Sequence, residues 1–274
     1  MKKFHVLSFL TVALLAILLV GCGKQSKNTI RIGASSIPHA QILKHVEPQL
    51  AKEGVHLKVT VFQDYIMPNE ALAEKELDAN YFQTTAFLDR WNANYGGHLI
   101  SVGSVHLEPI GIYSKKVKKL QDLKPNSKIL VSDNVPDYGR ILDLFQKAGL
   151  ITMKPGVNVA NANFSDIEKN PRHLQFEDSY DPKLMTDIYK NNEGDAVAIN
   201  SNYAVQAGLI PKRDSIALQK SDPNSPYNNI VAVRKSERNN QNIKKLMNAL
   251  QSKSTQKWIK SKYKGAVLPS KDPD

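Results

Sequence analysis

Hydrophobic residues recur with two different periods along most of this 274-residue chain. In residues 55–61 every second side chain is Val or Leu, which is the pattern of a strand with one buried face. Between Ile42 and Leu50 the apolar residues recur at the three- and four-residue steps of a helix, and Gly54 follows them. Alternation between the two patterns predicts an α/β chain in which helices pack on the faces of sheets.

The same patterns predict the order of the elements. We expect strands at residues 30–32, 55–61, 78–82, 128–132, 174–178, 195–200 and 230–234, and helices at residues 38–53, 68–77, 138–148 and 240–264. Residues 99–114 are predicted to form one extended segment, long enough to leave one lobe and enter the next. Phe87, Trp91 and Tyr95 recur at steps of four, which we interpret as the core-facing stripe of a helix rather than a ligand cage.

Two β-α sets joined by two extended crossings predict two lobes around a cleft. Residues 29–108 together with 230–274 are expected to form lobe I, and residues 109–229 to form lobe II. Each lobe would be a mixed sheet flanked by helices. Because ligands of open α/β sheets lie beyond the carboxyl ends of the strands, the residues that follow the strands are the candidates for a binding site.

The N-terminus has the features of an export signal. Two lysines precede an apolar run of about 15 residues, which is shorter than the roughly 20 residues of a membrane-spanning helix. The run ends in Leu19-Val20-Gly21-Cys22, which resembles the lipobox of bacterial lipoproteins. The resemblance implies a signal peptide at residues 1–21, and lipid on Cys22 followed by a polar tether to residue 28. The alternatives are a signal peptide that happens to contain a cysteine, or a short membrane anchor.

Composition excludes several other classes of protein. Cys22 is the only cysteine, so no disulfide framework is possible and a packed core must stabilise the chain. The formal net charge of +11 could suggest a nucleic-acid-binding protein. We exclude this class because the export signal removes the chain from the cytoplasm, and because the lysines lack interleaved aromatic residues. We interpret the lysine-rich segments as solvated helix faces.

No sequence pattern of a known catalytic site is present. The chain has no G-x-S-x-G, H-E-x-x-H, P-loop or G-x-G-x-x-G motif. The histidines are scattered, and no two have the i, i+4 spacing of a helical metal site. We interpret the following as surface or loop residues: His39, His45, His56, His98, His106 and His173. The expectation is a protein with no catalytic residue, no metal site and no cofactor.

Arg140 is the most informative candidate for binding. We expect Asp137 to cap a helix that begins at Tyr138, which places Arg140 in the first turn, where a cation opposes the helix macrodipole. Gly139 beside it weakens the helix further. Both features are explained if an anion docks at this helix end and pairs with the guanidinium. The alternative is a surface arginine packed over a neighbouring turn.

Amide and aromatic side chains follow the other strands. Asn200 and Asn229 offer groups that can accept from an ammonium or donate to a carboxylate, although an asparagine here can equally be a turn residue. Tyr65, Tyr81 and Phe82 offer ring faces suited to an apolar or thioether side chain. Together these groups predict an amino acid or short peptide as the ligand.

Several ordered segments resemble the methionine-binding lipoproteins of ABC importers. They are residues 63–72, 77–83, 108–116, 139–140, 147–151 and 225–229. The resemblance implies a two-lobed periplasmic-binding-protein type II fold, a permease and an ATPase as partners, and a monomer held at the extracytoplasmic face of the cell membrane. It also implies that Arg140 holds a ligand carboxylate, that Asn200 and Asn229 hold its other polar groups, and that Tyr65, Tyr81 and Phe82 line the side-chain pocket.

Two departures from the family pattern leave the ligand open. Thr84 stands where the family usually has histidine, and residues 133–138 differ from its usual Asn-Asp-Pro-x-Asn loop. Methionine is the first expectation, and a different amino acid or a methionine-containing dipeptide is the second. A lipid-anchored enzyme or a surface adhesin are the alternatives from other classes.

Overall fold

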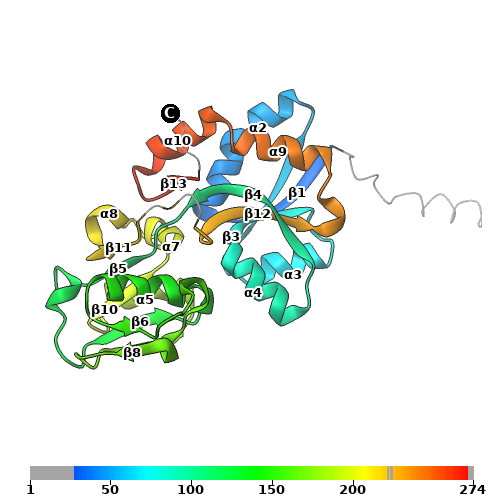
Figure 1. Cartoon of the computed structure of the whole chain (residues 1–274). Coiled ribbons are helices and arrows are strands. Elements are labelled where there is room, and N and C mark those ends of the chain that lie inside the picture. Colours follow the sequence, from blue (N-terminus) through cyan, green and yellow to red (C-terminus); the bar gives the residue numbers. More distant parts are fainter. Residues whose placement is uncertain (1–27, 221, 223–224, 271–274) are drawn as a thin grey trace, which may run out of the picture.

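Two sheets form the frame of the computed structural model, which describes residues 28–220, 222 and 225–270 (Figure 1). The predicted signal peptide at 1–21 and Cys22 lie outside the described residues, as does the predicted tether except for Asn28. Within the described ranges, no helix has both the length and the apolar character needed to cross a membrane.

The larger sheet combines strands from both ends of the described chain. Its strand order is β13-β4-β12-β3-β1-β2, and β1 runs parallel to β2 and β3 whereas β12 runs antiparallel to β3 and β4. The strands are β1 (Thr29–Ser35), β2 (His56–Phe62), β3 (Ala79–Thr84), β4 (Leu99–Leu107), β12 (Asn228–Arg234) and β13 (Leu268–Pro269). Its helices are α2 (Gln41–Lys52), α3 (Met67–Ala73), α4 (Thr85–Tyr95), α9 (Gln241–Leu250) and α10 (Lys253–Tyr263).

The smaller sheet is built from the middle of the chain. Its order is β11-β5-β10-β6-β9, with β6 parallel to β9 and β10, and β5 antiparallel to β10. The strands are β5 (Gly111–Tyr113), β6 (Lys128–Ser132), β9 (Gln175–Tyr180), β10 (Ala196–Ile199) and β11 (Ala217–Leu218). Its helices are α5 (Tyr138–Lys147), α6 (Met185–Lys190), α7 (Ser201–Gln206) and α8 (Pro211–Asp214).

Short elements complete the connections. A two-stranded ribbon pairs β7 (Thr152–Met153) with β8 (Ile167–Lys169). A π-helical turn, η2 (Ser36–Ala40), precedes α2, and the 3₁₀ turns are η3 (Leu120–Asp122), η4 (Val135–Asp137), η5 (Val159–Asn161), η6 (Phe164–Asp166), η7 (Pro182–Leu184) and η8 (Lys235–Glu237). The predicted α/β fold, with two mixed sheets each flanked by helices, is confirmed.

Each sheet has its own hydrophobic core, and the apolar stripes predicted for the helices face that core. The stripe Ile42, Leu43, Val46 and Leu50 on α2 is fully buried against β1 and α9. In the smaller sheet, Ile141, Leu142 and Phe145 of α5 are buried over β6. Because each sheet packs its own apolar faces, the two lobes meet through the chain crossings and through side chains at the strand ends.

The extended segment predicted at residues 99–114 is interrupted. β4 ends at Leu107 and β5 begins at Gly111, and the residues between them pair with no strand. Pro109 explains the break, because proline has no backbone N–H to donate to a sheet ladder. The interruption turns Glu108 into the space between the two sheets.

Two predicted helices are shorter than expected. The helix at Pro68 ends at Ala73, and Lys75 then adopts a positive φ of 68°. The segment at residues 240–264 divides into α9 and α10, because the Ser252 side chain accepts a hydrogen bond from the Thr255 N–H and begins a new helix.

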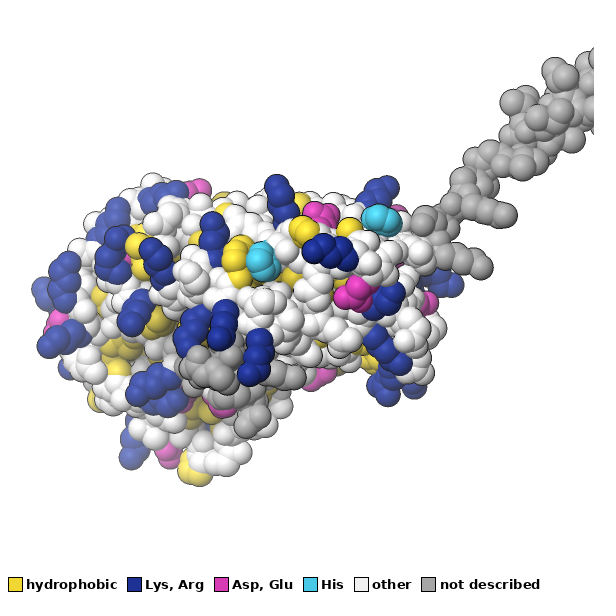
Figure 2. All heavy atoms as spheres, turned by 90° about the horizontal axis from the view of Figure 1, so that it is seen from above, with side chains coloured by type: hydrophobic (Ala, Val, Ile, Leu, Met, Phe, Trp, Pro, Cys, Tyr) yellow, Lys and Arg dark blue, Asp and Glu magenta, His cyan; other side chains and the backbone are white. Residues whose placement is uncertain are grey.

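The basic side chains are distributed over the surface. Figure 2 shows lysines and arginines spread across the visible face, with acidic and apolar side chains between them. Lys116, Lys128 and Lys147 each pair with a nearby carboxylate. This arrangement fits solvated faces rather than a single basic groove.

Candidate functional site

A small chamber lies where the strand ends of the two sheets face one another. We call it the inner chamber, and it encloses about 40 Å³. Its walls are His39, Tyr65, Phe82, Gln83, Thr84, Phe87, Glu108, Asn134, Asp137, Arg140, Asn200, Ser201, Asn202 and Asn229. These residues come from η2, the loop after β2, the end of β3, the start of α4, the crossing after β4, the turn at η4, the start of α5, the segment from the end of β10 into α7, and the start of β12. Elements of both sheets therefore build one site.

Six of the seven ligand-binding residues predicted from the sequence line the inner chamber. They are Tyr65, Phe82, Thr84, Arg140, Asn200 and Asn229. Tyr81 is not among the lining residues, since its side chain is fully buried and its hydroxyl bonds to His106 Nδ1. Adjacent side chains of a strand point to opposite faces, so Phe82 faces the chamber and Tyr81 faces the core. The expectation that both rings line one pocket is thereby corrected.

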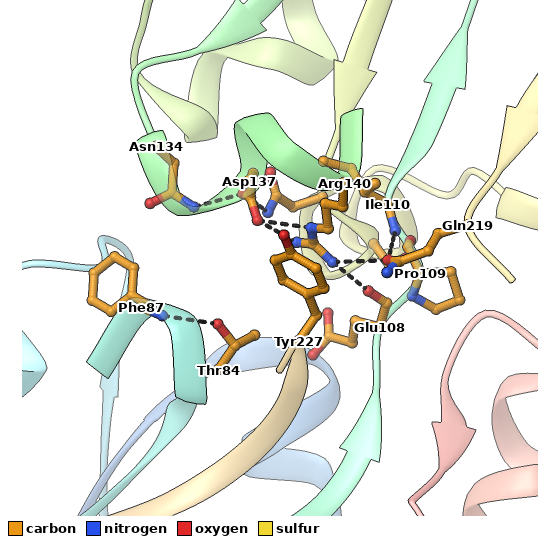
Figure 3. Close-up of polar contacts among 12 residues, drawn as sticks. Thr84, Phe87, Glu108, Pro109, Ile110, Asn134, Asp137, Arg140, Gln219 and Tyr227 are labelled. Atoms are coloured by element: carbon orange, nitrogen blue, oxygen red, sulfur yellow. Dashed lines mark hydrogen bonds and ion pairs between the residues drawn. The ribbon is translucent and has the colours of Figure 1, made fainter. Parts of the chain in front are cut away.

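Arg140 is buried and already has a partner. Its side chain is 5% exposed and lies against the Asp137 carboxylate, with Nε 2.8 Å and Nη2 2.5 Å from Oδ1 (Figure 3). Nη1 donates to the Glu108 carbonyl at 3.1 Å and to Gln219 Oε1 at 3.2 Å. The guanidinium carbon also lies 4.9 Å from the centre of the Tyr227 ring. Packing and hydrogen bonds thus fix Arg140 in one position, and the alternative of a surface arginine is wrong.

Asp137 does not act as the helix cap that the sequence suggested. Its side chain makes no capping hydrogen bond to α5. Its Oδ2 instead accepts from Asn200 Nδ2 at 2.7 Å and from Asn134 Nδ2 at 2.5 Å. The Asp137 carboxylate therefore binds to Arg140 and Asn200, the two side chains that were predicted to bind a ligand.

Gly139 has a steric explanation. A Cβ added at this position would lie 1.6 Å from the Val159 carbonyl oxygen, so α5 can approach η5 only where residue 139 is glycine. The glycine is required by helix packing, and it is no longer independent support for a docked anion.

Two buried histidines lie beside Glu108: His39 lines the inner chamber, and His106 contacts Glu108 without lining the chamber. His39 is 1% exposed and His106 is fully buried, so the interpretation of these two as surface or loop residues is wrong. His106 Nε2 lies 2.8 Å and His39 Nε2 lies 3.3 Å from Glu108 Oε1. The ligand-type atoms of the three residues all lie within 4.8 Å of one another, a grouping that could hold a metal ion. The 2.8 Å separation is itself an ordinary hydrogen-bond length.

Burial sets the charge state of this cluster. It lowers the pKa of His39 to about 4 and the pKa of His106 to about 3, so both rings are neutral at pH 7. A neutral ring has one donor and one acceptor, so His106 Nε2–H donates to Glu108 while Nδ1 accepts from the Tyr81 hydroxyl. Burial also raises the pKa of Glu108, which His39 and Arg140 oppose. The cluster of His39, His106 and Glu108 is therefore rich in acceptors and carries no positive charge.

A second, wider cavity adjoins the first. We call it the outer chamber, and it encloses about 320 Å³. Its walls are Asp64, Tyr65, Ile66, Phe87, Arg90, Trp91, Asn94, Tyr95, Asp133, Asn134, Val135, Pro136, Asp181, Pro182 and Tyr203. The chambers share Tyr65, Phe87 and Asn134. A molecule whose polar end lies in the inner chamber can therefore extend an apolar group toward the outer one.

The aromatic stripe of α4 lines this outer chamber. Trp91 is 7% exposed and packs in the core, as predicted, whereas Tyr95 is 62% exposed. The two rings stack with their centres 5.4 Å apart. The interpretation of a purely core-facing stripe is wrong for Tyr95, because the helix ends at the rim of the sheet and leaves that ring in solvent.

Hydrogen bonds cross the chamber from one set of elements to the other. The Tyr65 hydroxyl donates to Asn202 Oδ1 at 2.8 Å, and the Tyr203 hydroxyl donates to the Gln63 carbonyl at 3.2 Å. His39 Nε2 also lies 2.9 Å from Asn229 Oδ1. The two tyrosine hydrogen bonds thus join the two sides of the cleft, whereas the His39–Asn229 contact joins two elements on the larger-sheet side.

The sequence patterns did not identify Glu108 and His39, which line the inner chamber, or His106, which is bonded to Glu108 outside the lining. Glu108 and His106 are two residues apart on an extended segment, a spacing that places both on one face and could have revealed them. His39 lies far away in the chain and gave no such signal. Asp137 was noticed, but its position before a helix favoured a cap over an ion pair.

Comparisons with known proteins agree with this architecture. Residues 30–271 match the model of the NlpA lipoprotein family. The chain is 45% identical over 275 residues to the methionine-binding lipoprotein MetQ of Bacillus subtilis, with 98% of this chain and 99% of that protein covered. The full length of that relative is thus represented.

Solved structures give the same result. A pheromone cOB1 precursor/lipoprotein of the YaeC family from Enterococcus faecalis is 49% identical, with a TM-score of 0.85 over 88% of this chain and 99% of that one. A nutrient binding protein from Burkholderia cenocepacia, solved bound to methionine, is 36% identical, with a TM-score of 0.81 over 88% of this chain and all of that one. The chain belongs to the NlpA lipoprotein family.

Proposed function

We propose that this protein is the substrate-binding component of an ABC importer and captures methionine or a closely related amino acid or short peptide. The observation that carries the proposal is the composition of the inner chamber. Arg140 and Asn200, beside the smaller sheet, and Asn229, on β12 of the larger sheet, place polar groups around a closed space that the Tyr65 and Phe82 rings also line. An amino acid needs this combination, because its charged end must be paired when water is excluded.

The relatives support the choice of ligand class. The B. subtilis relative is named for methionine binding, and the B. cenocepacia structure contains methionine. Thr84 and the loop around Asn134 and Asp137 line the same chamber, so a different amino acid or a methionine-containing dipeptide is the second candidate.

The ligand enters the inner chamber when the two lobes separate. About 40 Å³ is room for only a few water molecules, whereas ligand pockets measure about 300–1,000 Å³. We take lobe I as residues 29–108 with 230–274 and lobe II as residues 109–229, and we place the hinge at the two chain crossings. Closure around the ligand then presents a form of the protein that the permease and its ATPase recognise.

Isothermal titration calorimetry tests the proposed function. The panel is L-methionine, D-methionine, methionine dipeptides, leucine, phenylalanine and cystine, with maltose, phosphate and Zn²⁺ as ligands of other classes. We expect at least one amino acid or short peptide to bind with micromolar or tighter affinity. Binding of only a sugar, phosphate or metal would contradict the proposal.

We further propose that lipid on Cys22 anchors the protein at the extracytoplasmic face of the cell membrane, as a monomer. Family membership and the lipobox-like sequence support the anchor. Cys22→Ser should abolish labelling by a radioactive fatty acid and leave uncleaved precursor or protein shed into the medium. A lipidated Cys22→Ser protein of mature size would disprove the assignment.

A further inference from the structure

The carboxylate of Asp137 lies where the ligand carboxylate is expected. Arg140 and Asn200 are the residues proposed to hold a ligand, and both donate to Asp137. Figure 3 shows the contact between Arg140 and Asp137. Together with Asn134, they make four polar contacts of 2.5–2.8 Å to the two oxygens of this one side chain.

Counting donors and acceptors shows that the anion position is full. A carboxylate offers about four lone-pair positions, and Asp137 uses all four. Arg140 has five N–H groups, of which two face Asp137 and two more contacts go to Glu108 O and Gln219 Oε1. Arg140 therefore has one N–H group left and cannot make a bidentate contact with a second carboxylate while Asp137 is in place.

Charge leads to the same result. Asp137 and Arg140 are 4% and 5% exposed, so their opposite charges cancel inside a dry site. The nearby His39 and His106 are neutral at pH 7, and Glu108 adds no positive charge. The inner chamber therefore has no uncompensated cation that would attract a free carboxylate.

We propose that Asp137 is a specificity-determining residue that occupies the carboxylate position as a tethered competitor. A ligand with a free carboxylate must displace Asp137 from Arg140 and Asn200. A ligand with a neutral amide or peptide group at this place avoids that cost. Asp137 thereby shifts the preference of the chamber from a free amino acid toward a ligand whose carboxyl group is in amide linkage.

This inference rests on the proposed function, and its test uses matched ligands. Calorimetry compares L-methionine with L-methioninamide, in which a neutral amide replaces the carboxylate, on the wild type and on Asp137→Asn. We expect the substitution to strengthen L-methionine relative to L-methioninamide by about ten- to a hundredfold, the value of a charge-assisted hydrogen bond. An affinity ratio unchanged within about twofold would overturn the inference.

Asp143→Asn is the matched control. It removes an aspartate from α5, the helix that directly follows Asp137, where Asp143 pairs with the exposed Lys147. The affinity ratio of the two ligands should stay at the wild-type value. A shift as large as that of Asp137→Asn would show that any lost charge on α5 has this effect, and would overturn the inference.

A second measurement is independent of the natural ligand. Acetate can fill a vacated carboxylate position, whereas acetamide carries no charge. At equal concentration, acetate should raise the Tm of Asp137→Asn by about 2–4 °C more than acetamide does, with no difference in the wild type. Equal effects of the two solutes on Asp137→Asn would count against the inference.

The two measurements separate the proposals. If acetate stabilises Asp137→Asn but neither methionine compound binds, the proposed function is wrong and the inference that Asp137 occupies an anion position is supported. Binding of both compounds with an unchanged ratio and no acetate effect would sink the inference and keep the function. Asp137→Ser is measured in parallel, and loss of folding in both variants would overturn the inference, because Asp137 would then be an indispensable structural partner of Arg140.

Discussion

The inner and outer chambers share part of a wall but differ in what holds their walls in place. Buried charges and amides order the inner chamber, where the Arg140 and Asp137 side chains are 5% and 4% exposed. Aromatic rings and exposed side chains form the outer one, where Tyr95 is 62% exposed. Charged side chains bind the polar end of a ligand most strongly where water is excluded, as in the inner chamber. The aromatic faces of the solvent-exposed outer chamber can accept ligand side chains of different shapes.

The largest expected effect is on stability in the inner chamber. Arg140→Ala leaves Asp137 as an uncompensated buried charge, and the free energy of unfolding should fall by about 3–5 kcal/mol. Urea denaturation measures it. Lys147→Ala removes one partner of an exposed pair on the same helix, and should cost less than about 1 kcal/mol. Equal losses of unfolding free energy in Arg140→Ala and Lys147→Ala would contradict the claim that the buried ion pair matters more for stability than the exposed one.

The second effect is a pH dependence to which His39 and His106 contribute. His39 and His106 have folded pKa values of about 4 and about 3, below the ordinary value of about 6.5, so the unfolded chain binds more protons as the pH falls below 6.5. Stability should therefore fall with pH from about 6.5 toward 4. Glu108 has the opposite sign, since its raised pKa stabilises the folded state at low pH and this contribution is lost as the pH rises through the folded value.

Urea titrations at several pH values between 4.5 and 7.5 measure this dependence. Each histidine contributes at most about 1.4 kcal/mol per pH unit in this window. His106→Gln should remove about half of the combined histidine slope, whatever its effect on stability at pH 7. An unchanged slope would show that other groups cause the acid sensitivity.

A third effect contrasts the rings of the two chambers. Phe82→Ala removes a 5% exposed ring from the inner wall, and should weaken ligand binding about tenfold or more, from a loss of about 1.5–3 kcal/mol of apolar contact. Tyr95→Ala in the outer chamber should change the Kd less than about threefold. Calorimetry that found the larger loss in Tyr95→Ala would place the ligand side chain in the outer chamber.

The smallest effect concerns the bond across the mouth of the cleft. Tyr65→Phe removes the hydroxyl that donates to Asn202 Oδ1 at 2.8 Å and keeps the ring. The closed form should lose about 0.5–1.5 kcal/mol, seen as a faster ligand dissociation rate in stopped-flow measurements. Tyr95→Phe is the control and should leave the rate unchanged.

Strong periodicity predicted most of the fold. The apolar stripe of α2 identified a helix and the alternation in β2 identified a strand, because one face of each element is buried or half-buried. Element ends were less predictable, since Pro109 and Ser252 interrupt segments whose apolar pattern continues. These interruptions depend on a single backbone donor or cap, and a pattern averaged over many residues does not detect them.

The candidate site was predictable residue by residue, but its pairings were not. Residues after strands came together because strand ends of one sheet share an edge. The sequence could not show that the Asp137 carboxylate would pair with the Arg140 side chain rather than cap the backbone N–H groups of α5. A capping aspartate and an aspartate in an i, i+3 ion pair occupy the same position before the helix. It also could not show that His39 would reach Glu108, because that contact depends on how β1 and β4 are placed in the sheet.

A crystal structure of the protein grown with the tightest-binding amino acid or short peptide of the calorimetry panel tests the central claim most directly. We expect one bound molecule between the lobes, with its polar end beside Arg140, Asn200 and Asn229 and its side chain toward Tyr65 and Phe82. Electron density for the ligand only in the outer chamber against Trp91 and Tyr95, or no bound molecule at saturating concentration, would contradict it.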